Sequence, residues 1–144
     1  MESSYLLLKY LHILAVLGWI SSTSSLGLFL LYKTFIVKDL NQYLERKFYR
    51  FLTIFELLFF ALVLLLGLTM ATKYNMLDLK WVRYKIMIAF GFFLPLEILN
   101  GILIFKFVKN ERWFKIYDKF ILLISIPLII FGLIVIYLAV FKIN

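Results

Sequence analysis

Four long apolar stretches dominate this sequence, at roughly residues 5–32, 51–72, 86–105 and 120–141. Each has the length of about 20 residues that a helix needs to cross the hydrocarbon core of a bilayer. Of the 144 residues, 65% are hydrophobic and 17% are charged, and a domain of this size cannot bury so much apolar surface in its own core. The sequence therefore predicts an all-α integral membrane protein, and excludes a soluble enzyme and a disordered tail.

The connections between the stretches are short and carry helix-start signals. Asp39 and Gln42 form a capping-box pattern, and Asp78 and Asn110 are suitable N-caps for the third and fourth helices. We expect one domain over residues 1–144, an up-down four-helix bundle with helices at about 5–32, 40–73, 79–107 and 112–141. The first stretch is longer than a signal-peptide core and lacks a cleavage site, so we expect it to remain.

Basic residues cluster between the apolar stretches, and the net charge is +8. Ten of the sixteen Lys and Arg residues belong to the first and third connections, and six belong to the opposite side. The positive-inside rule then predicts that these two connections are cytoplasmic and both termini outside, in the cell membrane. The basic residues indicate contact with the lipid bilayer and not with nucleic acid. The absence of cysteine excludes disulfides and thiolate metal sites.

Four ionisable residues fall inside the apolar stretches: His12, Glu56, Lys85 and Glu97. Because such side chains are costly at membrane depth, each is a candidate functional residue. His12 and Lys85 enter from the same side at similar depth, which would allow a shared pocket. Alternatively, Lys85 extends to the headgroups with Arg83, and His12 is a neutral imidazole bonded to a neighbouring helix.

Glu56 and Glu97 form a second pair, at similar depth on the second and third helices. Two adjacent carboxyl groups would share a proton, which suits a proton relay. Equally, either could accept hydrogen bonds from Asn100 or neutralise a basic residue of a connection. Helical periodicity places Glu56 on one face with Gly67, and Glu97 on one face with Phe90 and Gly101.

Two further features concern helix shape and packing. Gly18, Ser21, Ser22 and Ser25 form a small face on the first helix, which we interpret as a packing surface more readily than as a substrate path. Two prolines, Pro95 and Pro127, lie near the centres of the third and fourth helices, where each removes a backbone hydrogen bond and predicts a kink.

Two motifs resemble a known superfamily. The run Lys9-Tyr10-Leu11-His12 with Trp19 seven residues later, and the run Trp81-Val82-Arg83-Tyr84-Lys85, are similar to the HemJ-like membrane proteins. The related CopD-like proteins and uncharacterised integral membrane proteins share the histidine near the start. The resemblance implies a protoporphyrinogen oxidase that binds haem, with His12 and Lys85 as the functional pair.

The chain also departs from the HemJ pattern. It has Ser24-Ser25-Leu26-Gly27 in the region after Trp19, where that family has a Pro-Arg pair, and it lacks the further histidines on the first and third helices. Before the fourth helix it has Asp118-Lys119 in place of an Asn-Glu-x-Pro motif. These differences leave a haem or quinone pocket as the expectation, with the porphyrin chemistry open.

Three functions are therefore open. The first is a haem-associated membrane oxidoreductase with His12 as catalytic residue and metal ligand and with Lys85 as its catalytic partner, which binds a haem propionate or a substrate carboxylate. Trp19 would lie beside the cofactor, and Glu56 with Glu97 would form a proton relay. The second is a non-catalytic accessory subunit of a respiratory or transport complex, packed as a homo-oligomer or against partner membrane subunits. The third is a copper-import protein, although its methionines are few and scattered.

Overall fold

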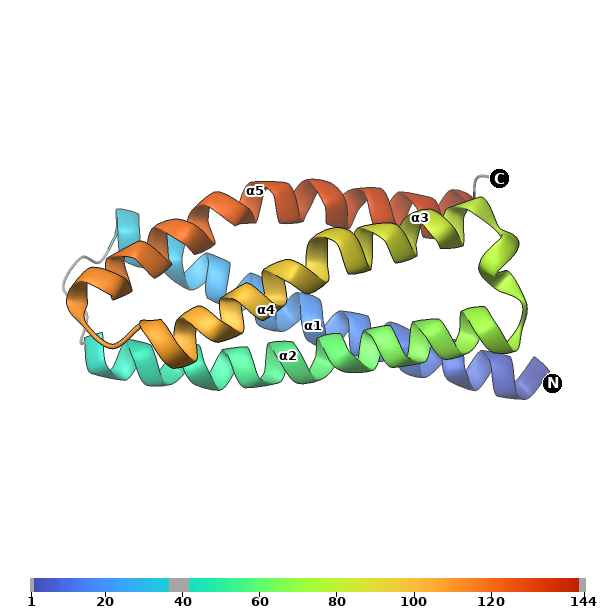
Figure 1. The fold of residues 1–144 in the computed structure, drawn as a ribbon, viewed down its shortest axis with the longest axis horizontal. Coiled ribbons are helices and arrows are strands. Elements are labelled where there is room, and N and C mark those ends of the chain that lie inside the picture. The colour runs from blue at the N-terminus through green and yellow to red at the C-terminus, as the bar shows by residue number, and fades with distance from the viewer. Residues whose placement is uncertain (1, 37–41, 143–144) are drawn as a thin grey trace.

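The computed structural model describes residues 2–36 and 42–142, which are almost entirely helical (Figure 1). The predicted capping box at Asp39 and the predicted helix start at residue 40 lie outside the described residues. The elements are, in chain order, α1 (Glu2–Phe35), α2 (Gln42–Lys73), the 3-10 helix η1 (Met76–Asp78), α3 (Lys80–Ile88), the π-helix η2 (Ala89–Phe93), α4 (Leu94–Ile102), the π-helix η3 (Leu103–Phe107) and α5 (Glu111–Phe141).

The elements run up and down as four rods, because α3, η2, α4 and η3 follow one another in a single line (Figure 1). Helix α1 packs mainly against α2, and α3 packs against α5. The start of α1, the finish of α5 and the α2–α3 connection lie at one end of the bundle, which we call the terminal end. The opposite end, where α1 and η3 finish, is the loop end. Within the described residues, the predicted all-α four-helix architecture is confirmed.

The four rods are long and apolar enough to cross a membrane, over Ser3–Phe35, Leu44–Lys73, Lys80–Phe107 and Glu111–Phe141. Their outer surfaces are apolar as well. On α5, for example, Ile126 is 65% exposed and Ile129 and Leu133 are each 62% exposed. An apolar surface this extensive is what contact with lipid requires, and water would disfavour it.

The third rod contains two π-helical turns, η2 and η3, which the apolar pattern did not reveal. The first ends two residues before Pro95, which has no N–H to donate to the preceding turn, so the wide turn lies where that hydrogen bond is missing. A π turn contains more residues than an α turn, so it changes which side chains share a face of the rod. Phe90, predicted beside Glu97, is 38% exposed, whereas Glu97 is 4% exposed. Pro127 lies inside α5, which continues through it.

One of the two predicted caps within the described residues is confirmed and one is wrong. The Asn110 side chain accepts a hydrogen bond from the Trp113 N–H at 2.9 Å and starts α5. Asp78 does not cap α3, because it belongs to the 3-10 helix η1 and the extended residue before α3 is Leu79. An N-cap needs an extended backbone, and the 3-10 turn moves that position one residue onward.

Two arginines of α2 bind the carbonyl groups at the end of the third rod. Arg50 donates to the carbonyls of Ile104 at 3.4 Å and Val108 at 3.3 Å, and Arg46 donates to that of Lys109 at 3.1 Å. The last carbonyls of a helix have no partner within it, and cations there also oppose the helix dipole. These arginines therefore stabilise the end of the rod, whatever their effect on membrane orientation.

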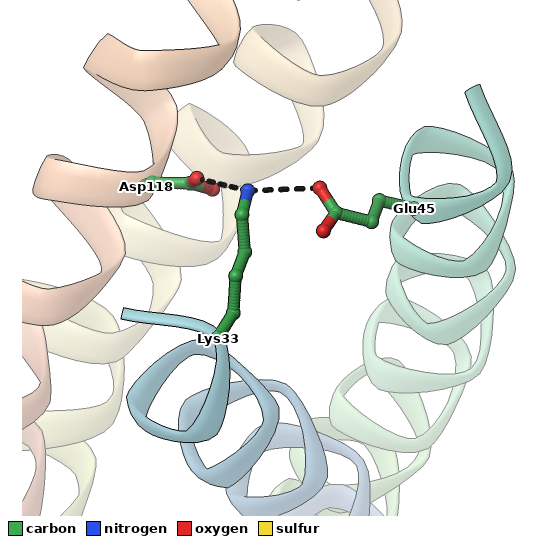
Figure 2. Close-up of polar contacts among 3 residues, drawn as sticks. All are labelled: Lys33, Glu45 and Asp118. Carbon is green, nitrogen blue, oxygen red and sulfur yellow. Dashed lines mark hydrogen bonds and ion pairs between the residues drawn. The ribbon is translucent and has the colours of Figure 1, made fainter. Parts of the chain in front are cut away.

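An ion triad joins three helices at the loop end (Figure 2). The Nζ of Lys33 on α1 lies 2.8 Å from Glu45 Oε2 on α2 and 2.8 Å from Asp118 Oδ2 on α5. The same Nζ lies 4.4 Å from the centre of the buried Phe114 ring. The Glu45 side chain is 3% exposed, and those of Lys33 and Asp118 are each 17% exposed. One cation thus compensates two carboxylates.

Replacing Lys33 by methionine leaves these two carboxylates close together without a cation. We expect Lys33→Met to lower the free energy of unfolding by about 3 kcal/mol, because removing one partner of a buried ion pair leaves an uncompensated charge. Thermal unfolding in detergent measures this, with the exposed Lys115→Met as control. Neutralising all three residues, by Lys33→Met, Glu45→Gln and Asp118→Asn, should restore most of the loss. Equal stability of Lys33→Met and Lys115→Met would contradict a structural role for the triad.

Candidate functional site: two neighbouring cavities inside the bundle

A cavity of about 380 Å³, which we call the larger cavity, lies between the rods toward the terminal end. Its walls are almost entirely apolar, and His12 and Lys85 are its ionisable lining residues. This volume is within the range that small-molecule and cofactor sites occupy. The structure thus places His12 and Lys85 in one cavity, as their similar depth in the membrane had suggested.

His12 projects from α1 against Gly67 of α2. A β-carbon at Gly67 would lie only 3.1 Å from His12 Cε1 and 3.6 Å from Nδ1, so glycine is what allows the ring to pack here. The backbone of Val63, one turn earlier, faces the imidazole. The Nδ1 atom is buried and has no hydrogen-bond partner. His12 therefore presents one unused nitrogen while its ring is held against α2.

Lys85 approaches from α3 and is half-buried, whereas Arg83, two residues earlier, is exposed. Its Nζ lies 5.4 Å from the centre of the Trp81 ring, and its charge is near enough to act on the His12 imidazole. Lys85 thus lines the larger cavity and does not accompany Arg83 at the surface. The cavity consequently combines an apolar body with a cation and an imidazole at one end.

Trp19, Phe60 and Phe93 form an aromatic layer on the side of the larger cavity that faces the loop end. The Trp19 ring centre lies 5.0 Å from that of Phe60 and 5.0 Å from that of Phe93. Its indole Nε1 donates a hydrogen bond to Glu97 Oε1 at 3.0 Å. Trp19 therefore contacts the larger cavity with its ring and a buried carboxyl group with its N–H.

Glu56 and Glu97 lie beyond this layer, each 4% exposed, with their carboxyl groups in contact. Glu56 accepts hydrogen bonds from Asn100 Nδ2 at 3.4 Å and from Thr23 Oγ1 at 3.5 Å. Asn100 in turn accepts one from the Tyr117 hydroxyl at 2.6 Å. The network takes side chains from all four rods, and its hydrogen bonds to Glu56 and Glu97 come from no lysine or arginine within the described residues.

A second void of about 20 Å³, the smaller cavity, adjoins the two carboxyl groups. Its polar lining consists of Thr23, Glu56, Glu97, Asn100 and Ser125. Only part of the small face predicted on α1 packs inside the bundle. Gly18 lies against Phe59, with 2.6 Å between a β-carbon at this glycine and the ring, and Ser22 is buried, whereas Ser21 and Ser25 are exposed.

The described residues contain no group of three or more His, Cys, Asp or Glu side chains placed to hold a metal ion. His12 can therefore serve a metal in the larger cavity only if another molecule supplies most of the ligands.

Comparison of the chain with protein-family models, with curated proteins and with solved structures gave no match. The assignment of the site therefore depends on its geometry. Sequence reasoning located His12, Lys85, Glu56, Glu97, Trp19 and Asn100, but not Thr23 as a partner of Glu56, nor Tyr117 and Ser125. Tyr117 lies in the basic segment before the fourth apolar stretch, where a tyrosine is ordinarily interfacial.

The close approach of Gly67 and His12 gives a direct test of this geometry. We expect Gly67→Ala to displace the imidazole and to lower the free energy of unfolding by about 1 kcal/mol, because the added methyl group overpacks the contact. Because His12 is the one histidine in the chain, its ring gives a single set of histidine NMR signals, which should shift. Gly132→Ala is the control, since nothing lies within 4 Å of a β-carbon there. Unchanged imidazole signals in Gly67→Ala would show that His12 lies elsewhere.

Proposed function

We propose that this chain is an integral membrane oxidoreductase that binds haem, or a related porphyrin, in the larger cavity. The observation that carries the proposal is the pairing of an imidazole with a lysine in an otherwise apolar cavity. A porphyrin has matching chemistry, with a broad apolar ring, a metal that accepts an imidazole, and carboxylate groups at one edge. The resemblance of the His12 and Lys85 motifs to HemJ-like proteins supports the same conclusion.

Each residue has a role in this proposal. His12 would hold the metal through one imidazole nitrogen, while the ring bonds the Val63 backbone. Such a second hydrogen bond orients most metal-bound histidines in proteins. Gly67 leaves the Val63 carbonyl accessible, because the residue four positions after a helical carbonyl would otherwise cover it. Lys85 binds a propionate or substrate carboxylate, and bound haem supplies a centre that accepts and donates single electrons.

The carboxyl groups of Glu56 and Glu97 hold and release a proton close to this redox site. Two carboxyl groups in contact inside an apolar bundle favour the state in which they share one proton. The Trp19 N–H donates to Glu97 and thereby favours negative charge on that oxygen. Proton transfer thus takes place next to the aromatic layer, outside the larger cavity itself.

Absorption spectra of the protein purified in mild detergent test haem binding. We expect a Soret band, in the protein as isolated or after haem addition, that shifts on reduction with dithionite. It should be lost in His12→Ala, because the axial ligand is removed. Lys85→Met should keep the band but bind haem about tenfold more weakly, as expected for one lost charge-assisted hydrogen bond. The exposed Lys80→Met is the matched control and should bind as wild type.

A colourless protein that stays colourless after haem addition would exclude this function. The alternative of a non-catalytic accessory subunit in a larger membrane complex would then be favoured, and proteins that copurify with the chain would identify that complex.

We further propose that the loop end faces the cytoplasm, with both termini on the other side. The ten basic residues of the two connections at that end support this orientation, against six on the other side. The chain has no cysteine, so single cysteines introduced as Lys109→Cys and Lys73→Cys can be labelled separately. In intact cells, a membrane-impermeant maleimide should label Lys73→Cys and leave Lys109→Cys unlabelled until the membrane is opened. The reverse pattern would invert the orientation.

A further inference from the structure

The larger cavity is closed at both of its ends along the bundle. Toward the loop end it stops at the aromatic layer. Toward the terminal end it is covered by a packed cluster of buried residues, namely Ala71, Trp81, Val82 and Leu138. Water at either end of the bundle therefore meets packed side chains before it reaches the cavity.

The cavity is open, by contrast, on its side. Several residues that line it are also exposed on the outer surface of the bundle: Ile13, Leu17 and Ile20 of α1, Phe90 of η2 and Ile136 of α5. Leu17 is 54% exposed and Ile136 is 51% exposed. A side chain can line a cavity and be half exposed only where that cavity meets the surface. All of these residues are apolar, so the edge of the opening is apolar as well.

Helical spacing places this opening between α1 and α5. The two helices approach each other at Gly27, where a β-carbon would lie 3.9 Å from Ser125 Oγ. Ile20 and Ile13 precede Gly27 by seven and fourteen residues, and Ile136 follows Ser125 by eleven. At 3.6 residues per turn, each of the three lies within about 40° of the face that makes this contact. Beyond it, the two helices diverge toward the terminal end (Figure 1).

The surroundings of the opening limit what can enter it. The opening lies along helices that are long and apolar enough to cross a membrane, so in a bilayer the hydrocarbon core would border it, and not water. A ligand that enters from there must dissolve in hydrocarbon, which requires a largely apolar body. Lys85 inside the cavity adds a second requirement, because its ammonium group favours a ligand with an acidic group.

We propose that the larger cavity takes its ligand sideways from the bilayer, through the opening between α1 and α5, and that this ligand is an acidic amphiphile. Its carboxylate binds Lys85, and its apolar part fills the cavity and extends into the opening. This inference rests on the proposed function in that it concerns the same cavity. A porphyrin dissolved in the membrane and a fatty acid share the required chemistry, whereas small water-soluble carboxylates are excluded.

A brominated fatty acid tests the route in phosphatidylcholine vesicles. Bromine quenches tryptophan fluorescence on contact, and Trp19 lines the cavity. With Trp81 and Trp113 replaced by phenylalanine, Trp19 is the one tryptophan left in the chain. Dibromostearate at alkaline pH should quench Trp19 saturably. Acrylamide, which stays in water, should quench it little.

The methyl ester of dibromostearate tests the acidic group. It has the same chain but no charge for Lys85 to bind. The acid should therefore reach half-maximal quenching at about one tenth of the mole fraction that the ester needs. Lys85→Met should remove this difference, and the exposed Lys80→Met should keep it.

A removable block at the opening gives the decisive comparison. The chain has no cysteine, so Ile136→Cys can carry a single benzyl group, attached as a disulfide with benzyl methanethiosulfonate. The group should raise the mole fraction for half-maximal quenching about tenfold, because it takes the apolar space of the ligand chain. Reduction of the disulfide should restore the original value. Ile130→Cys is the matched control, since Ile130 is also on α5, is 52% exposed and lines neither cavity.

The outcomes separate this inference from the proposed function. Equal effects of the benzyl group at the two cysteines, or stronger quenching of Trp19 by acrylamide than by dibromostearate, would overturn the lateral route. Equal action of the acid and its ester would overturn the acidic ligand. A chain that passes these tests but stays colourless after haem addition keeps the lateral site and loses the haem. A chain that binds haem but fails them keeps the proposed function and loses this inference.

Discussion

The constraint on which this structure depends is the absence of water around polar groups inside an apolar bundle. An inward-facing carboxyl, amide or hydroxyl group is therefore costly unless another group of the chain bonds to it. The network of Trp19, Glu97, Glu56, Asn100 and Tyr117 meets this requirement with side chains from all four rods. A shift of any rod by one turn would separate these groups, so the polar network fixes a register that apolar packing alone specifies weakly. The triad of Lys33 does the same at the loop end.

The two cavities differ in what they can bind because their linings differ. The larger one is apolar apart from one imidazole and one ammonium group, so it suits a large lipophilic molecule with an acidic edge. The smaller one combines carboxyl, amide and hydroxyl groups with leucine and isoleucine side chains, and it is close to the size of one water molecule. Between them lies the aromatic layer of Trp19, Phe60 and Phe93, so the two cavities are separate environments a short distance apart.

Depth and helical periodicity predicted much of this arrangement. They placed His12 with Lys85 and Glu56 with Glu97, because residues at equal depth that face the inside of a small helix bundle lie close together. They failed where the backbone departs from a regular α-helix. The π turn before Pro95 moved Phe90 off the face of Glu97, and the 3-10 turn displaced the predicted cap from Asp78 to Leu79. The triad was missed for another reason, since Lys33, Glu45 and Asp118 are distant in sequence and each is ordinary at a membrane boundary.

Trp19 has a consequence that follows from its two contacts. Its ring belongs to the wall of the larger cavity, and its N–H bonds to Glu97 beside the smaller one. A molecule that presses on the ring alters the geometry of that hydrogen bond, and a change of charge on Glu97 alters the position that the ring prefers. Such an effect would be reciprocal by thermodynamic linkage, because occupancy of the larger cavity and the charge of Glu97 would change each other's free energy by the same amount. One indole thus connects the larger cavity with the buried carboxyl pair.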